Sequence, residues 1–290
     1  MSKALQIYYT AVLGALGGLA GWWAVGAVDT AGWPLWPAYL FVGAGLGLCI
    51  AAAVAATEGA LVKRSRPRAL LDALRGGLAG ALLGAAGLVA AGALFLALGG
   101  GFAGRSAGWM LLGAAIGLSD IAVSGRRRRA VLGALGGVAG GLVGGLLYEG
   151  LTLAFLDSSD RAQMVVGGVG LVLVGACIGA LIPLARQVLA AGELRVLRGQ
   201  QAGLTREVND TVTIGRYDGC DLYLPDAGVA WRHGLVRRVA SGFQFEVLPG
   251  AEGGALVGGQ VVLPGGVAAL AGGERIRVGE AELEFVGLRR

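Results

Sequence analysis

The residues best suited to chemistry are few and widely separated along this 290-residue chain. Its single histidine is His233, and its three cysteines, Cys49, Cys177 and Cys220, have no paired spacing. A zinc site or a histidine-dependent nucleophile needs at least one further imidazole or thiolate nearby. Cys49 and Cys177 fall inside apolar runs, where a free cysteine behaves as a small hydrophobe. The sequence therefore predicts no enzyme activity, no cofactor, no metal site and no disulfide framework.

Three acidic residues, Glu58, Asp120 and Glu149, lie within apolar segments or at their ends. Ionisable groups at membrane depth are costly, and they are candidates for an ion or proton pathway. Glu58 and Asp120 occupy equivalent positions in two segments, but Ile182 stands at the third such position, so a ring of three carboxylates cannot form. The alternative interpretation places Glu58 and Asp120 near the membrane surface, paired with neighbouring basic side chains, and Glu149 at an interface.

Five short motifs, several of them with arginine or glycine, follow one another near the C-terminus. They are Thr213-Ile214-Gly215-Arg216, CDLYLPD at 220–226, VAWRH at 229–233, LVGG at 256–259 and GGERIRVG at 272–279. A guanidinium offers the forked, charge-assisted hydrogen bonds that suit a phosphate. The order and spacing of these motifs resemble the forkhead-associated (FHA) domain, in which IGR, a D-x-x-L-x-D turn and SRxH occur in this order. The resemblance covers residues 193–288.

This resemblance implies a protein-binding module of Ser/Thr kinase signalling, which holds phosphothreonine with an arginine, a serine and an asparagine. Arg216 matches the arginine, but Ala230 stands at the serine position and Gly253 at the asparagine position. Each missing group contributes on the order of 1 to 2 kcal/mol toward a charged ligand, so affinity should fall by roughly tenfold to several hundredfold. We therefore expect a degenerate phosphothreonine site.

The same resemblance assigns structural roles to Gly215 and His233, with the histidine bracing the binding loops. Arg232, Arg237 and Arg238 are candidates to restore positive potential near these loops. A further interpretation is that the domain binds unphosphorylated protein.

The motifs lie in a segment whose pattern is typical of a β-sandwich. From Glu193 onward, short alternating runs such as TVTIGR, FQFEV and AELEFVG are separated by glycine. We expect about ten short strands in an all-β FHA-type domain over residues 191–290.

The first 190 residues have a different composition. The whole chain is 55% hydrophobic and only 15% charged, and its apolar residues concentrate before residue 190. A helix needs about 20 apolar residues to cross the hydrocarbon core of a bilayer. Six segments approach or meet this length, at 6–28, 37–60, 69–98, 107–124, 130–156 and 162–189. We predict an α-helical membrane bundle of six transmembrane helices over residues 1–190.

Basic residues predict the orientation of this bundle. They follow the second and fourth segments, at Lys63, Arg64, Arg66, Arg68 and Arg126 to Arg129, whereas the opposite loops hold only Arg105 and Arg161. The positive-inside rule then places both termini in the cytoplasm. This placement explains the net charge of +5 without a nucleic-acid partner. The high glycine, alanine and arginine content is typical of a bacterium with a GC-rich genome, so the expected location is the bacterial inner membrane.

Internal repeats divide the helical segment into three. GGLAG at 17–21 recurs at 76–80 and as GGVAG at 136–140, and the segments starting at Ala51, Gly113 and Gly175 echo one another every 62 residues. We expect three helical hairpins of about 60 residues around a pseudo-threefold axis, packed through glycine. The first, third and fifth helices should form the inner ring.

Two functions are compatible with this organisation. The leading hypothesis is a membrane-anchored adaptor that presents the FHA-like domain to a cytoplasmic protein, with a phosphothreonine-containing protein as one option and a second copy of the chain as another. The alternative is a channel or transporter subunit regulated by the FHA-like domain. A closed, glycine-packed centre would favour the adaptor, whereas acids facing an inner cavity would favour the channel.

Overall fold

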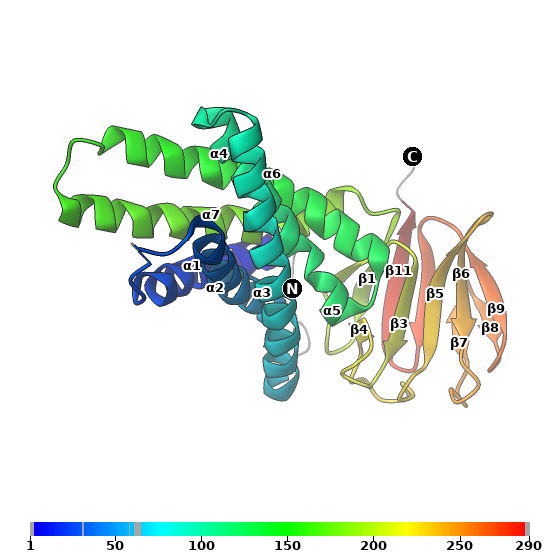
Figure 1. The fold of residues 1–290 in the computed structure, drawn as a ribbon. Coiled ribbons are helices and arrows are strands. Elements are labelled where there is room, and N and C mark those ends of the chain that lie inside the picture. The colour runs from blue at the N-terminus through cyan, green and yellow to red at the C-terminus, as the bar shows by residue number, and fades with distance from the viewer. Residues whose placement is uncertain (1–2, 31, 58, 61–64, 288–290) are drawn as a thin grey trace. The chain divides into compact units, whose positions relative to one another are not determined.

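The computed structural model describes residues 3–30, 32–57, 59–60 and 65–287. The chain divides into two compact units. One is helical and runs from Gln6 to Arg186, and the other comprises the residues from Gln187 onward together with the extreme N-terminus. Figure 1 shows the helices of the first unit and the strands of the second.

Seven α-helices are formed by the described residues. They are α1 (Lys3–Gly26), α2 (Leu35–Thr57), α3 (Arg66–Ala97), α4 (Gly101–Leu118), α5 (Asp120–Ser124), α6 (Arg127–Ala154) and α7 (Asp160–Val188). Within the described part of the chain, six spans are long and apolar enough to cross a membrane, with α4 and α5 forming one span from Gly101 to Ser124. The predicted number of such helices is therefore confirmed.

Local chemistry sets several of the helix ends. Pro67 lies in the first turn of α3, where its missing N–H costs nothing because that N–H has no partner within the helix. Gly125 separates α5 from α6 with a φ of 67°, the left-handed conformation that commonly ends a helix. Beyond α6 the chain turns sharply, so that α6 and α7 form a long hairpin (Figure 1).

The buried side chains at the centre of the helical unit come from α2, α4 and α7. They are Leu46, Ile50 and Ala51 of α2, Leu112 and Ile116 of α4, and Val174, Ile178 and Ile182 of α7. Ile50, Leu112 and Val174, spaced 62 residues apart, are each 0% exposed. The expectation that the first, third and fifth helices form the inner ring was therefore wrong. The bulky residues that can fill the centre lie on α2, α4 and α7, whereas many large apolar side chains of α1, α3 and α6 are exposed.

Glycine allows neighbouring helices to pack backbone against backbone. A Cβ added to Gly113 of α4 would lie only 2.0 Å from the carbonyl oxygen of Gly137 in α6, and the reverse is equally close. The same kind of contact recurs between Gly47 of α2 and Gly80 of α3, and between Gly175 of α7 and Gly14 of α1. Close backbone approach at small residues is the typical way that membrane helices associate.

The threefold recurrence of these contacts follows a register different from the one that the GGLAG strings suggest. Gly14, Gly76 and Gly137 face Gly175, Ala51 and Gly113, respectively. These three glycines are spaced 62 and 61 residues apart, so Gly76 corresponds to Gly14 rather than to Gly17. Because glycines recur on more than one face of α1, a match of sequence strings can slip by about one helical turn.

The second unit is a β-sandwich, as predicted. Its strands are β1 (Gly192–Arg198), β2 (Thr205–Val208), β3 (Thr211–Gly215), β4 (Leu222–Tyr223), β5 (Gly234–Val239), β6 (Gly242–Val247), β7 (Ala255–Val257), β8 (Gln260–Val262), β9 (Val267–Leu270), β10 (Glu274–Val278) and β11 (Ala281–Gly287). One sheet has the order β2-β1-β11-β10-β7-β8 and the other β4-β3-β5-β6-β9. Alternate residues of the strands, including Ile214, Val236 and Phe245, are fully buried between the sheets.

We predict that Gly137→Ala destabilises the helical unit, because the new methyl group would overlap the carbonyl of Gly113. Overpacking of this kind typically costs about 1–3 kcal/mol. The measurement is the thermal unfolding midpoint of the purified chain in detergent. Gly150→Ala is the matched control, since it lies on the same helix with no atom within 4 Å of an added Cβ. Equal midpoints for the two variants would contradict the close contact between α4 and α6.

Candidate functional site

Three connections at one end of the sandwich carry the motif residues. Arg216 follows β3, Ala230 and Arg232 lie before β5, and Gly253 lies before β7. Because Ile214 of β3 pairs with Gly234 of β5, the end of one strand lies beside the start of the other. The backbone N–H of Arg216 donates to the carbonyl of Ala230 at 3.0 Å. The first two connections are thus joined directly.

His233 joins the third connection to the other two. Its side chain is 0% exposed. Its Nδ1 accepts a hydrogen bond from the Ala230 N–H at 3.1 Å, and its Nε2 lies 2.8 Å from the carbonyl oxygen of Gly254. Since Nδ1 accepts, the neutral imidazole carries its proton on Nε2 and donates it to Gly254. The histidine is therefore a bracing group between loops, with both ring nitrogens occupied.

Burial lowers the pKa of His233 below its ordinary value, because the charged imidazolium would be desolvated, although the hydrogen bond to Gly254 opposes this shift. The ring therefore stays neutral at physiological pH, and a neutral ring is what the Ala230 N–H requires as an acceptor. A role in direct contact with phosphate is not available to a fully buried side chain.

Gly215 is required by close packing between two connections. A Cβ at this position would lie 2.4 Å from the carbonyl oxygen of Trp231 and 2.9 Å from the Cα of Arg232. Any side chain would push the segment that contains Ala230 away from Arg216. The glycine thus sets the distance between the residues of the candidate site.

Two aspartates stabilise the loops in a way that the sequence motif did not reveal. Asp221 accepts hydrogen bonds from the backbone N–H and the hydroxyl of Thr213, at 2.9 and 2.7 Å. Asp226 is buried and accepts from the backbone N–H of Gln200 at 2.7 Å. The D-x-x-L-x-D spacing indicated a turn, but the partners are distant in sequence and only the fold brings them together.

The three residues that the sequence resemblance assigned to phosphate binding have different surroundings. Arg216 is exposed, Ala230 is half-buried and Gly253 is exposed. No atom lies within 4 Å of a Cβ built on Gly253. A larger side chain at residue 253 would therefore fit.

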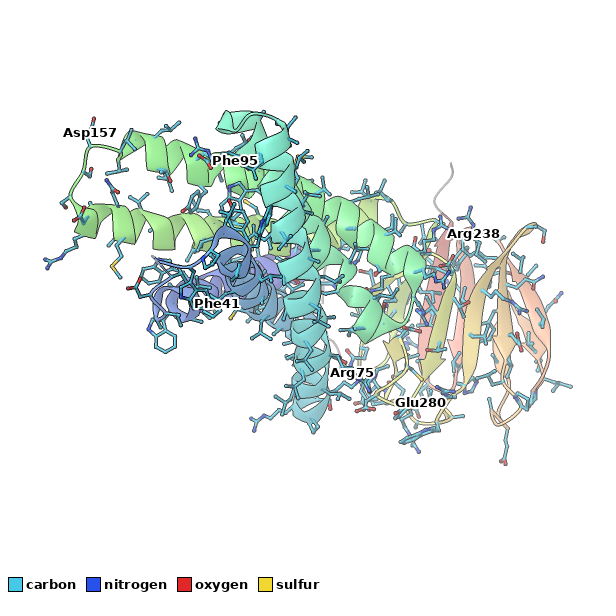
Figure 2. All side chains as sticks on the ribbon, viewed as in Figure 1. Phe41, Arg75, Phe95, Asp157, Arg238 and Glu280 are labelled. Carbon is cyan, nitrogen blue, oxygen red and sulfur yellow. The ribbon has the colours of Figure 1, made fainter. Side chains whose placement is uncertain are left out.

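The arginines proposed to reinforce this site are at opposite ends of the sandwich. Arg232 is exposed on the same connection as Ala230. Arg237 instead pairs with Thr211 across the sheet, and its guanidinium is 3.3 Å from Glu246. Figure 2 shows Arg238 at the end of the sandwich opposite to Glu280, whose N–H bonds to Ala227 beside the site loops. Each residue advances a strand by about 3.3 Å, so Arg237 and Arg238 lie well along β5 from the end that faces the site. They therefore cannot contact a ligand bound there.

An aromatic pair lies beside Arg216, and the sequence motifs did not predict it. The rings of Tyr217 and Trp231 stack with centroids 4.8 Å apart and an interplanar angle of 25°. Trp231 is nevertheless 63% exposed. An exposed tryptophan held flat by a neighbouring ring is a suitable contact surface for a protein partner. The signal available in the sequence was the tryptophan itself, which occupies the arginine position of the SRxH motif.

Asp120 and Glu149, the two candidate intramembrane acids that the structure describes, each lie close to arginine. Glu58 lies outside the described residues. The carboxylate of Asp120 is 3.2 Å from Arg129 and 3.3 Å from Arg186, and the cavity beside it has a volume of only about 40 Å³. Glu149 is 4% exposed, and its carboxylate lies 3.4 Å from the guanidinium of Arg105.

Comparisons with known proteins identify the second unit. The FHA domain family model matches residues 212–279. An FHA domain with phosphothreonine-dependent interactions is 26% identical, with a TM-score of 0.30, over 34% of this chain and 98% of its own. The FHA domain of the CT664 protein from Chlamydia trachomatis is 19% identical, with a TM-score of 0.31, over 34% and 98%. That of an Arabidopsis thaliana protein is 20% identical, with a TM-score of 0.33, over 36% and 90%.

A search of curated proteins found no match for this chain. The family match and the sandwich together show that the chain carries an FHA domain at its C-terminus, a module that generally binds phosphothreonine-containing proteins rather than catalysing reactions.

We predict that the domain loses stability as pH falls below about 6.5, the pKa of histidine in the unfolded chain. The folded pKa of His233 is lower, so the unfolded state binds more protons in this range. The free energy of unfolding should fall by at most about 1.4 kcal/mol per pH unit, until the pH drops below the pKa of His233 in the folded domain. Urea unfolding of residues 191–290 between pH 7.5 and 5.5 measures it.

The control for this titration is His233→Gln, because His233 is the only histidine in the chain. The variant should be less stable at pH 7.5 by about 1–3 kcal/mol, since a loop N–H or C=O loses its partner. Its stability should change little over the same pH range. An equal pH dependence in both proteins would contradict the assignment.

Proposed function

We propose that this protein is a membrane-anchored adaptor, in which a helical domain of residues 1–190 holds an FHA domain of residues 191–290 at the cytoplasmic face. The observation that carries the proposal is an FHA framework complete in its bracing contacts but reduced to one phosphate-ligand side chain, Arg216. A domain of this kind binds proteins, and the helical domain would anchor it at the membrane. Self-association of the chain is a further property compatible with this proposal.

Exposed apolar side chains support insertion of the helices into a bilayer. Leu74, Leu78 and Leu82 form one face of α3 and are 55%, 64% and 76% exposed, respectively. Trp23 of α1 is 71% exposed. Extensive apolar surfaces of this kind are rare on soluble monomers and mark contact with a membrane or a partner. With the basic loops in the cytoplasm, both termini lie on that side, in a bacterial inner membrane.

A closed centre favours the anchor over a channel or transporter. Ile50, Leu112 and Val174 fill the middle of the bundle at 0% exposure. Asp120 is neutralised by two arginines rather than lining a pore. The channel interpretation would need a continuous polar path through this apolar layer. Among the described residues, the cavity beside Asp120 has a volume of only about 40 Å³, and a larger cavity, beside Glu149, lies at the other end of α4 and α6.

The loop end of the FHA domain supports a binding mode that depends less on phosphate. Arg216 alone provides one forked contact, whereas Trp231 adds a large rigid surface beside it. Arg232 contributes a second positive charge on the same connection. A partner that presents acidic and apolar groups would satisfy these residues with or without phosphothreonine, and so we place the protein in a Ser/Thr phosphorylation circuit with a weakened phosphate preference.

We predict that residues 191–290 bind phosphothreonine peptides with a small preference over matched unphosphorylated peptides, and that Arg216→Ala abolishes it. The double variant Ala230→Ser/Gly253→Asn should raise affinity for the phosphopeptide by about tenfold or more, since it adds two hydrogen-bonding groups and an added Cβ at residue 253 meets no atom within 4 Å. Fluorescence anisotropy with paired peptide libraries measures both effects.

The control for these binding measurements is Arg238→Ala, which removes an arginine from the opposite end of the sandwich. It should leave the preference unchanged. The account of the site would fail if Arg238→Ala were as harmful as Arg216→Ala, or if the double variant gained no affinity for phosphate.

The membrane orientation predicts opposite labelling of two introduced cysteines. Ser159→Cys lies between α6 and α7 and should react with a membrane-impermeant thiol reagent in intact cells. Glu252→Cys lies in an exposed FHA loop and should react only after permeabilisation. The unmodified chain supplies the background, since Cys220 is buried and Cys49 and Cys177 are half-buried. Labelling of both positions in intact cells would overturn the orientation.

A further inference from the structure

A cavity of about 400 Å³ lies in the helical unit between the ends of α2, α3, α4 and α6. Four aromatic side chains line it: Tyr39, Phe95, Trp109 and Tyr148. The rings of Trp109 and Tyr148 contact each other, with centroids 5.0 Å apart. Figure 2 shows Phe95 near the end of α3 that precedes α4. The volume falls within the range of small-molecule sites, about 300–1,000 Å³.

The cavity wall also carries two opposite charges. Glu149 is nearly completely buried, and its Oε2 lies 3.4 Å from Nε of Arg105. Arg105 is half-exposed, with a side-chain exposure of 52%. A carboxylate in an otherwise apolar and aromatic cavity is costly unless a cation accompanies it. Here the accompanying cation is the half-exposed Arg105, and both charged side chains line the cavity, so a ligand inside it can contact each of them.

The position of the cavity along the helices corresponds to the boundary between headgroups and hydrocarbon. Glu149 is about one and a half turns before the end of α6, and Arg105 is about one turn after the start of α4. Both ends lie on the side of the bundle away from Arg126 to Arg129. In the proposed orientation this is the outer leaflet of the membrane, where a phospholipid headgroup would meet both charges.

We infer that this cavity binds a zwitterionic amphiphile, an ammonium group joined to a phosphate on an apolar body. Glu149 and the aromatic rings suit the ammonium, since ring faces attract cations and the carboxylate supplies the charge. Arg105 suits the phosphate, for which a guanidinium provides two parallel donors. The opposite charges of the ligand replace the contact between Glu149 and Arg105, so neither side chain loses its partner.

The test uses the full-length chain, delipidated in detergent, with native mass spectrometry to count bound lipid. Phosphatidylethanolamine and phosphatidylglycerol with identical acyl chains form the comparison, because only the first carries an ammonium. Phosphatidylethanolamine should bind at least about tenfold more tightly. Soluble phosphoethanolamine, added as a competitor, distinguishes the two sources: displacement of the lipid assigns recognition to the headgroup alone, and retention assigns it to the intact lipid.

Three variants and a control make the result specific. Glu149→Gln should abolish the preference for the amine lipid, and Arg105→Gln should weaken binding of both lipids. Thr152→Trp should block binding while leaving both charges in place, because Thr152 lines the cavity and its hydroxyl donates to the Tyr148 carbonyl in α6 rather than to either charged group. Asp160→Asn, an exposed acid at the start of α7, should behave as the wild type.

Equal binding of the two lipids to the wild type would overturn the inference, as would an unchanged preference in Thr152→Trp. Fractionation of cells expressing each variant reports membrane insertion separately. A failure of the proposed anchor is thereby distinguished from a failure of the lipid site.

Discussion

Close approach of backbone to backbone at glycine is the constraint on which both units depend. In the helical unit, Gly113 and Gly137 bring α4 and α6 so near that no side chain fits between them. In the β unit, Gly215 lets the end of β3 lie against the segment that contains Trp231 and Arg232. The first set of contacts leaves the large side chains of α2, α4 and α7 to fill the centre of the bundle. The second holds Arg216 beside Ala230 in the candidate site.

The two units therefore suit different roles. The helical unit closes its centre with aliphatic side chains and neutralises Asp120 with arginines, which suits an anchor rather than a conduit. The FHA domain has bracing contacts made by His233, Asp221 and Asp226, while alanine and glycine stand at two positions that the sequence resemblance assigned to phosphate binding. The bracing contacts do not involve Trp231, which is stacked on Tyr217 and 63% exposed.

The helices, the sandwich and the order of the motifs could be predicted from the sequence, but the residues that contact one another in the folded chain could not. The six apolar helices and the sandwich were predictable, because span length and alternating runs are local signals. The inner ring was predicted wrongly, since glycine strings show where helices can approach but not which helices carry side chains to fill the centre.

Arg237 and Arg238 were placed too near the site because strand register, not sequence distance, decides which end of a sheet a residue occupies. The partners of Asp221 and Asp226, and the stack of Tyr217 on Trp231, depend on tertiary contacts that no local pattern encodes.

The most direct test of the adaptor account is recovery of protein partners from membranes with the full chain and with a chain that ends at residue 190. Quantitative crosslinking in cells, followed by solubilisation and mass spectrometry, measures the cytoplasmic proteins attached to each. The account predicts that the shortened chain still fractionates with membranes but loses its partners. Equal recovery of the same partners by both chains would contradict it and would move the binding function to the helical unit.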